Sequence, residues 1–183
     1  DTFLDTGRKG AETAAAKDNV ELLYAGDPES ANQAQLIQQA VDQGVDGIAV
    51  TLAKGDALED ALKNAEEAGI PVVGFNGGLE EAFEFGAFTF IGQDETVAGR
   101  ALGDRIAEDG YTKPLCVIQM QGHVGLEARC AGIKEKVPGT EILYVTGRDM
   151  TEVKSTITAK LQSTPDADLV VGLGAPFTLT AVD

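Results

Sequence analysis

The sequence predicts an α/β fold in which parallel β-sheets are flanked by helices, and three observations carry this prediction. Short apolar runs recur along the chain, and the run 71–75 is too short for a helix and lacks the alternation of a half-exposed strand. Between such runs lie stretches whose apolar residues share one helical face. Two of these stretches stop at glycines, Gly44 and Gly69. Strands that alternate with one-sided helices are typical of βαβ units and a parallel sheet.

The first half of the chain contains the elements of one α/β lobe. In order, we expect a helix over 7–17, a strand over 20–24, a helix over 31–43, a strand over 46–50, a helix over 56–68 and a strand over 71–75. A loop over 79–87, rich in Glu and Phe, then leads to a strand over 88–92. This alternation predicts a Rossmann-like lobe with a parallel sheet.

The second half repeats the alternation. We expect a helix over 95–108, a strand over 115–119, a helix over 125–136, a strand over 141–145, a helix over 151–163 and a strand over 168–173. We place the boundary near Gly92-Gln93-Asp94, which gives an N-terminal lobe over 1–92 and a C-terminal lobe over 93–183. A single continuous sheet is the alternative.

Both lobes are expected to be incomplete. A doubly wound sheet grows from a first central strand, whereas this chain starts at a helix. Without that strand, the strands at 20–24 and 47–51 lack the partner between them, and their backbone groups stay unpaired. We therefore expect a longer natural protein, with the first strand of the N-terminal lobe missing here and the C-terminal lobe truncated.

Composition excludes several classes of partner and site. The net charge of −16 argues against nucleic acid and anionic membranes, which bind basic patches. Two cysteines, Cys116 and Cys130, are too few for a structural zinc site, which usually takes four ligands. One lies on a strand and the other on the helix that returns across it, so a disulfide and two buried thiols both remain open. We expect no metal and no cofactor.

The motifs of common enzymes are missing from the sequence. It has no glycine-rich phosphate loop of Rossmann or Walker spacing, and no Gly-x-Ser-x-Gly turn. One histidine without a neighbouring thiol provides no nucleophile–base pair. We therefore expect a protein that is not an enzyme.

A candidate binding edge follows the strand at 71–75. The segment Asn76-Gly77-Gly78 ends this strand, and open α/β folds bind ligands at the carboxyl ends of their strands. An Asn side chain both donates and accepts hydrogen bonds, while glycines let a ligand approach the backbone. This combination suits a neutral polyol better than an ion, although Asn before Gly also caps turns.

Phe3, the region of Gly7 and Gly10, and three longer segments together carry a family resemblance. The three segments are Gly44-Val45-Asp46-Gly47-Ile48, Ala68-Gly69-Ile70-Pro71-Val72-Val73 and Gln93-Asp94-Glu95-Thr96-Val97-Ala98-Gly99. In register over the whole chain, the sequence resembles the periplasmic sugar-binding proteins of the ribose and galactose class, which are substrate-binding subunits of ABC importers. The effector domains of LacI-type repressors share their type I periplasmic-binding fold. The resemblance implies two lobes joined by a hinge that close on a sugar.

The resemblance also implies ligand-binding positions, which are Phe3, Asn76, His123, Arg129, Met150 and Ala175. Phe3 stands where the family stacks an aromatic on the sugar, and His123 and Arg129 match sugar contacts of the glucose/galactose-binding version. The sequence departs from the family at three of these positions. Asn76-Gly77 replaces the Asp-Arg that family members often carry, and Met150 replaces a second stacking aromatic. Ala175 lies where the family usually has Asn-Asp, which points either to backbone-mediated contacts or to another ligand, such as an inositol, a pentose or a furanosyl signal. The alternatives are a helix staple for Phe3, a solvated loop residue for His123 and a surface ion pair for Arg129.

The resemblance thus implies an extracytoplasmic protein, periplasmic or lipid-anchored at the cell surface. As a monomer it would capture a neutral sugar or polyol between its lobes and deliver it to the permease subunits of an ABC importer. The alternative is the cytoplasmic, dimeric effector domain of a LacI-type regulator. An oxidised Cys116–Cys130 bond would favour the exported protein.

Overall fold

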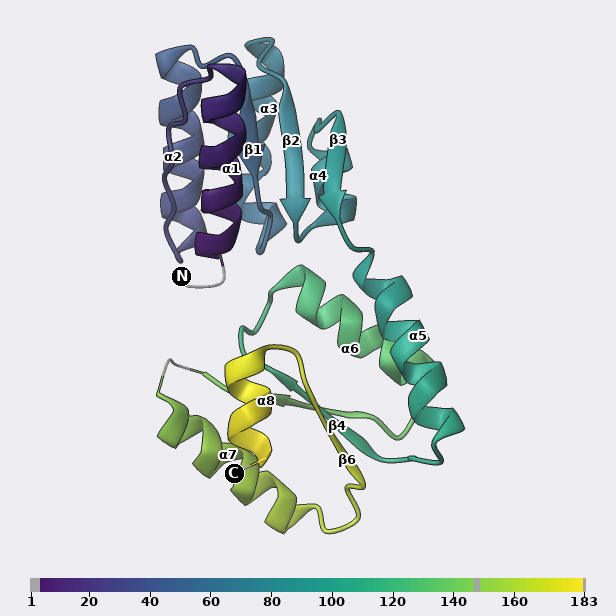
Figure 1. The fold of residues 1–183 in the computed structure, drawn as a ribbon. Helices are drawn as coiled ribbons and strands as arrows, with labels where there is room; N and C mark the ends of the chain where they lie inside the picture. The colour runs from purple at the N-terminus through teal and green to yellow at the C-terminus, as the bar shows by residue number, and fades with distance from the viewer. Residues whose placement is uncertain (1–3, 147–148, 183) are drawn as a thin grey trace.

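The computed structural model describes residues 4–146 and 149–182 and has an α/β architecture with two separate three-stranded sheets. Figure 1 shows the two sheets in different parts of the molecule, each with its own helices. All strand pairs in both sheets are parallel. The single continuous sheet is therefore excluded for the residues that the structure describes.

The first sheet has the order β1-β2-β3. Its strands are β1 (Ile48–Val50), β2 (Val72–Asn76) and β3 (Thr89–Gly92), and its helices are α1 (Leu4–Asp18), α2 (Ser30–Gln43), α3 (Glu59–Glu67) and α4 (Leu79–Glu84), with a 3-10 turn at Gly55–Leu58. One apolar core joins α2, α3 and α4 to β1 and β2, and Leu52, Leu58 and Leu62 are its fully buried leucines. Helix α1 contributes no buried side chain to it.

The second sheet has the order β5-β4-β6. Its strands are β4 (Pro114–Ile118), β5 (Glu141–Tyr144) and β6 (Leu169–Gly172), and its helices are α5 (Glu95–Glu108), α6 (Val124–Lys136), α7 (Met150–Ser163) and α8 (Ala175–Val182). Cys116 and Ile118 of β4 pack with α5 and α6, whereas Val117 packs with α7 and α8. The central strand β4 is therefore buried on both faces, as expected for a parallel strand.

Most predicted elements are confirmed within a few residues, and the helix over 95–108 is confirmed at both ends. Asp94 caps this helix, because its carboxylate accepts a hydrogen bond from the Val97 N–H at 2.9 Å. Asp149 caps α7 in the same way, accepting from the Thr151 N–H at 2.8 Å.

Two predictions are wrong. The segment 20–24 is not a strand, because within the described residues no strand lies beside it, and Val20 and Leu23 are each 60% exposed. The predicted loop 79–87 contains helix α4 instead. Ala82 and Phe85 are buried in the first core, and this burial stabilises the helix. The Glu-rich sequence alone does not indicate it.

The two cysteines form a disulfide, which decides the alternative that the sequence leaves open. Cys116 on β4 and Cys130 on α6 are both fully buried, with their Cα atoms 6.0 Å apart. The bond ties helix α6 to the centre of the second sheet. In the part of the chain that the structure describes, no helix is long and apolar enough to cross a membrane.

Candidate ligand site between the two sheets

The carboxyl ends of β1 and β2 form one edge of the first sheet, and in Figure 1 the arrowhead of β2 points toward the second half of the molecule. Thr51 follows β1, and Asn76 ends β2 just before Gly77-Gly78. The Leu52 N–H donates to the Gly77 carbonyl at 3.1 Å. Asn76 has a φ of 66°, in the left-handed region that Asn tolerates better than most residues. The chain therefore turns sharply here and leaves its polar groups at the edge.

The loop after β4 reaches this edge from the second half. The Val124 N–H, at the start of α6, donates to the Ala53 carbonyl at 3.0 Å, which links the two halves directly. The His123 imidazole lies against Gly77, where an added Cβ would stand 3.2 Å from its Cε1. Gly77 therefore leaves room for the histidine, and the structure brings His123 next to the glycine that follows Asn76.

Three polar atoms at these facing edges are buried without a hydrogen-bond partner among the described residues. They are Oγ1 of Thr51, Oε1 of Gln119 and Nδ1 of His123. Thr51 follows β1, Gln119 follows β4, and His123 ends the same loop. A buried polar group without a partner costs about 1–3 kcal/mol. Thr51 Oγ1 and His123 Cε1 both lie near Gly77, at 3.9 Å and 3.2 Å from the position of an added Cβ, whereas the Gln119 amide lies near Gly174. Unpartnered polar groups at the carboxyl edges of strands are the arrangement expected where a polar ligand completes the hydrogen bonds.

At pH 7 this setting favours the neutral form of His123. Burial lowers the pKa of the imidazole below the ordinary value of 6.5 and the Arg129 guanidinium lowers it further, although a backbone hydrogen bond and the carboxylates of Glu95 and Glu127 act in the opposite direction. A neutral imidazole has one N–H donor and one acceptor nitrogen. It can therefore pair with a hydroxyl group in either direction.

Arg129 on α6 is paired with Glu95 at the start of α5. Its Nε and Nη2 both face Oε2 of Glu95, and the two side chains are only 27% and 15% exposed. Arg129 thus forms an ion pair, as in the alternative from the sequence, but this pair is mostly buried and does not lie on the surface. Glu127, its neighbour in sequence, instead accepts hydrogen bonds from the Gly122 N–H and the Tyr144 hydroxyl, each at 3.0 Å.

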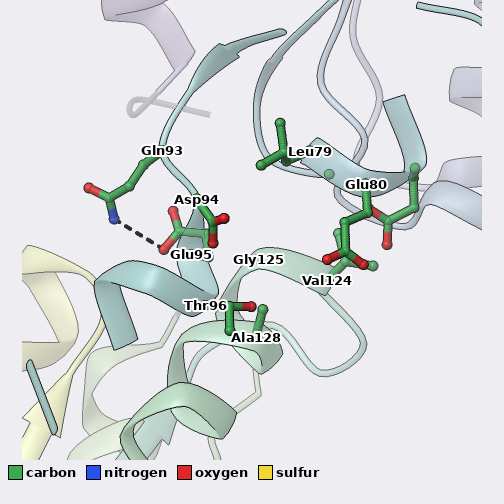
Figure 2. Close-up of a pocket in the computed structure, with 11 residues that line it drawn as sticks. Leu79, Glu80, Gln93, Asp94, Glu95, Thr96, Val124, Gly125 and Ala128 are labelled. Atoms are coloured by element: carbon green, nitrogen blue, oxygen red, sulfur yellow. Dashed lines mark hydrogen bonds between the residues drawn. The ribbon is translucent and has the colours of Figure 1, made fainter. Parts of the chain in front are cut away.

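A cavity of about 80 Å³ lies beside these groups, between the loop after β2 and the starts of α5 and α6. It is lined by Gly78, Leu79, Glu80, Glu81, Gln93, Asp94, Glu95, Thr96, Val124, Gly125 and Ala128. Figure 2 shows Gln93 and Glu95 joined by a hydrogen bond, in which the Gln93 amide donates at 3.3 Å. Four carboxylic acids line this cavity, but the described residues contain no cluster of side chains suited to a metal ion.

The candidate residues themselves do not line this cavity; their chain neighbours do. Gly78, Val124 and Ala128 stand two, one and one residues from Asn76, His123 and Arg129. Three of the candidates from the sequence therefore lie within two residues of the cavity lining, but none of them forms part of it. Thr51, Gln119 and Glu95 were not among them, because their importance comes from burial and pairing that the sequence does not display.

The remaining candidates lie elsewhere or outside the description. Met150 is the first residue of α7 and is partly buried against the core formed by Val117, Val145, Val153 and Ile157. Ala175 begins α8 and is exposed. Both helices follow strands of the second sheet, so both residues lie at its carboxyl edge. Phe3 lies outside the described residues.

Two parallel-stranded α/β halves, with polar groups at facing carboxyl edges, define a small-molecule binding protein of the type I periplasmic class. The family model of the periplasmic binding protein domain matches residues 1–183, and the chain belongs to this family. A carbohydrate transporter structure from Acidothermus cellulolyticus 11B, in complex with myo-inositol, is 52% identical with a TM-score of 0.94. The match covers 100% of this chain and 64% of that one.

Curated relatives are more distant. The galactofuranose-binding protein YtfQ of Escherichia coli K12 is 27% identical over 162 residues, covering 82% of this chain and 51% of the relative. A xylitol-binding protein of Mycolicibacterium smegmatis is 27% identical over 129 residues, covering 68% of this chain and 35% of that protein. The chain therefore spans about half the length, or less, of these relatives.

Proposed function

We propose that the protein is an extracytoplasmic substrate-binding protein that captures a neutral sugar or polyol and delivers it to the permease subunits of an ABC importer. The ligand would lie between an N-terminal lobe, 1–92, and a C-terminal lobe, 93–183. The protein would act as a monomer, in the periplasm or lipid-anchored at the cell surface, and without catalysing a reaction.

The observation that carries this proposal is the set of buried, unpartnered polar atoms on Thr51, Gln119 and His123. Thr51 and Gln119 carry no charge, and burial lowers the pKa of His123, which favours its neutral form at pH 7. Hydroxyl groups both donate and accept, so a polyol matches such a set better than an ion does. The likeness to a protein solved with myo-inositol supports the same class of ligand.

Charge around the site also favours a neutral ligand. The Arg129 guanidinium is offset by Glu95, and Glu80, Glu81 and Asp94 line the neighbouring cavity. An anionic group placed there would be repelled by several carboxylates at short range. Sugar phosphates are therefore poor candidates, and cyclic or linear polyols are good ones.

The mechanism follows from the arrangement of the lobes. A ligand that contacts Asn76 from the first lobe and His123 and Arg129 from the second makes all its contacts only when the lobes are close. Binding therefore shifts the population toward a closed form, with the crossing segment Gly92-Gln93-Asp94 as hinge. The permease would recognise that closed form. In the same proposal, Phe3, Met150 and Ala175 complete the ligand contacts.

The relatives support the importer rather than the LacI-type alternative, since those named above bind or carry carbohydrates. The buried Cys116–Cys130 disulfide supports an exported protein as well, because such bonds persist in oxidising compartments.

A thermal-shift screen of the complete natural protein tests this function. The panel contains myo-inositol, xylitol, D-arabinose, D-galactose and an inositol monophosphate, each at a saturating concentration. A ligand present at about 100 times its Kd stabilises the native state by about 2.7 kcal/mol, which raises the midpoint by several degrees.

We expect a shift with at least one neutral polyol and its loss in Asn76→Ala. Asn32→Ala serves as the matched control, because Asn32 is exposed on α2. A response to the phosphate alone, with none to neutral polyols, would contradict the proposal and favour the intracellular regulator.

A further inference from the structure

Helices α5 and α6 approach each other closely at two glycines, Gly99 and Gly132, where a larger residue would clash. An added Cβ at Gly99 would stand 2.2 Å from the Arg129 carbonyl oxygen, and one at Gly132 would stand 2.6 Å from the Thr96 carbonyl oxygen. Figure 1 shows the two helices side by side, with α5 following directly from β3. Because backbone meets backbone at these points, the position of Arg129 relative to α5 is set by the packing.

The backbone of Arg129 is held from a second side. The next residue, Cys130, is buried and joined to Cys116 of the central strand β4. A residue between a backbone contact and a disulfide has little freedom to move as a whole. What remains mobile is its long side chain, whose rotamer freedom must be lost when it binds a ligand.

Glu95 lies where it restricts this side chain. It is in the first turn of α5, where the helix dipole favours a carboxylate, and its neighbour Asp94 caps the helix. An added Cβ at Gly125 would stand 3.2 Å from Cγ of Glu95, so the glycine leaves space for it. Nε and Nη2 of Arg129 pair with Oε2 of Glu95. The Gln93 amide donates a hydrogen bond to the same oxygen.

This pairing leaves part of the guanidinium for a ligand. A guanidinium has five N–H donors in a rigid plane, and Glu95 occupies one edge of it. Within the described residues, Glu95 is the only side chain that pairs with Arg129. The Nη1 donors therefore keep a defined direction, while the positive charge is offset before any ligand arrives.

We propose that Glu95 determines the specificity for neutral ligands, by orienting Arg129 and compensating its charge. The inference rests on the proposed function and deepens it, because it explains how a site with an arginine selects a polyol over an anion. If Glu95 were uncharged, the arginine would keep its place but present an unbalanced positive charge. A phosphorylated ligand would then gain relative to its neutral counterpart.

The test compares the affinities for a neutral polyol and for its monophosphate, measured by calorimetry on the complete natural protein. The neutral probe is the polyol from the screen above with the largest shift. We expect Glu95→Gln to weaken neutral binding about tenfold and to raise the ratio of phosphate to neutral affinity by at least about tenfold. In the Arg129→Ala background the same substitution should change neither quantity, since its effect acts through the arginine.

Glu135→Gln is the matched control. Glu135 on α6 pairs with Arg100 on α5, at 2.5 Å between Nε and Oε2, but that pair is exposed and lies away from the cavity. The control removes the same charge from an ion pair between the same two helices and should leave both affinities unchanged. An equal change in the ratio for Glu135→Gln would overturn the proposal, because the effect would then be one of net charge.

A second variant, Glu95→Asp, separates the loss of the charge from a general disturbance of the fold. Glu95→Asp keeps the charge on a shorter side chain, so we expect weaker neutral binding without any gain in the ratio. A wild-type protein that binds no neutral polyol would refute the proposed function and this inference together. A wild-type protein that binds one, while Glu95→Gln keeps both affinity and ratio, would refute the inference alone.

Discussion

The two sheets are built from the same pattern but are buried to different degrees. Strand β4, at the centre of the second sheet, is buried at every residue and has an apolar core on each face. The first sheet has one core, and two apolar residues at its edge are mostly exposed: Phe88, just before β3, at 66% and Ile91, on β3, at 69%. A covalent bond also ties the second sheet to a helix, whereas the first has none. Similar sequence patterns thus produce one lobe with a single core and another with two cores and a disulfide.

This difference bears on the binding mechanism that we propose. In that proposal the second half provides a rigid frame, because α5, α6 and β4 are joined by close packing and by the disulfide. The first half would provide the edge at Asn76-Gly77, but it has helix α1 with no buried side chain and the exposed segment 20–24. We expect the first half to open more readily than the second under native conditions.

Hydrogen exchange gives the largest expected contrast. Amides of β4, which open only with the whole second half, should exchange at least about a thousand times more slowly than those of α1. Exchange measured by mass spectrometry on proteolytic fragments covers both segments. Equal protection of α1 and β4 would contradict the comparison.

Loss of the disulfide should weaken the second half selectively. The bond closes a loop with a sequence separation of 14 residues. Its removal in the double variant Cys116→Ala/Cys130→Ala should lower the free energy of unfolding by about 2–4 kcal/mol. Denaturant unfolding followed by exchange of β4 measures this loss. If protection against exchange fell in α1 and stayed constant in β4, the result would contradict the view that the disulfide supports the second half.

A glycine-to-alanine pair compares the helices directly. Gly99→Ala places a Cβ against the Arg129 carbonyl, and forcing α5 from α6 should cost about 1–3 kcal/mol. Gly7→Ala on α1 meets no atom within 4 Å and should instead stabilise, by up to about 1 kcal/mol, because Ala is the better helix former. Chemical denaturation of both variants provides the numbers. The same sign for both would show that close packing of α5 is unimportant.

The smallest expected effect concerns pH. Burial lowers the pKa of His123, so below about pH 6.5 the unfolded chain binds a proton more readily than the folded one. The free energy of unfolding therefore decreases as the pH falls from about 6.5 toward the lower pKa that His123 has in the folded protein. His123 is the sole histidine, so His123→Gln should lose less stability than the wild type between pH 7 and pH 5. Identical pH profiles for both proteins would show that the imidazole titrates normally.

Local features were predictable from the sequence. The helix 95–108 was predicted at both ends, and its start coincides with a local signal, since Asp94 caps it. A strand ending near Asn76 was predicted and is confirmed. That this carboxyl end binds a ligand stays a prediction. Segment 20–24 shows the limit of such reasoning. A strand-like sequence becomes a strand only when a partner strand pairs with it.

The site itself depends on contacts between distant parts of the chain. Glu95 and Arg129 are 34 residues apart, and their pairing requires Gly99 and Gly132 to bring α5 against α6. The unpartnered atoms of Thr51 and Gln119 become visible only when burial is known. The sequence was thus sufficient for the α/β class, most helices and strands, and the family, because caps and periodicity act over a few residues. The disulfide, the partner of Arg129 and the set of buried polar atoms were decided by the tertiary structure, because packing alone determines which distant groups meet and which lose their water.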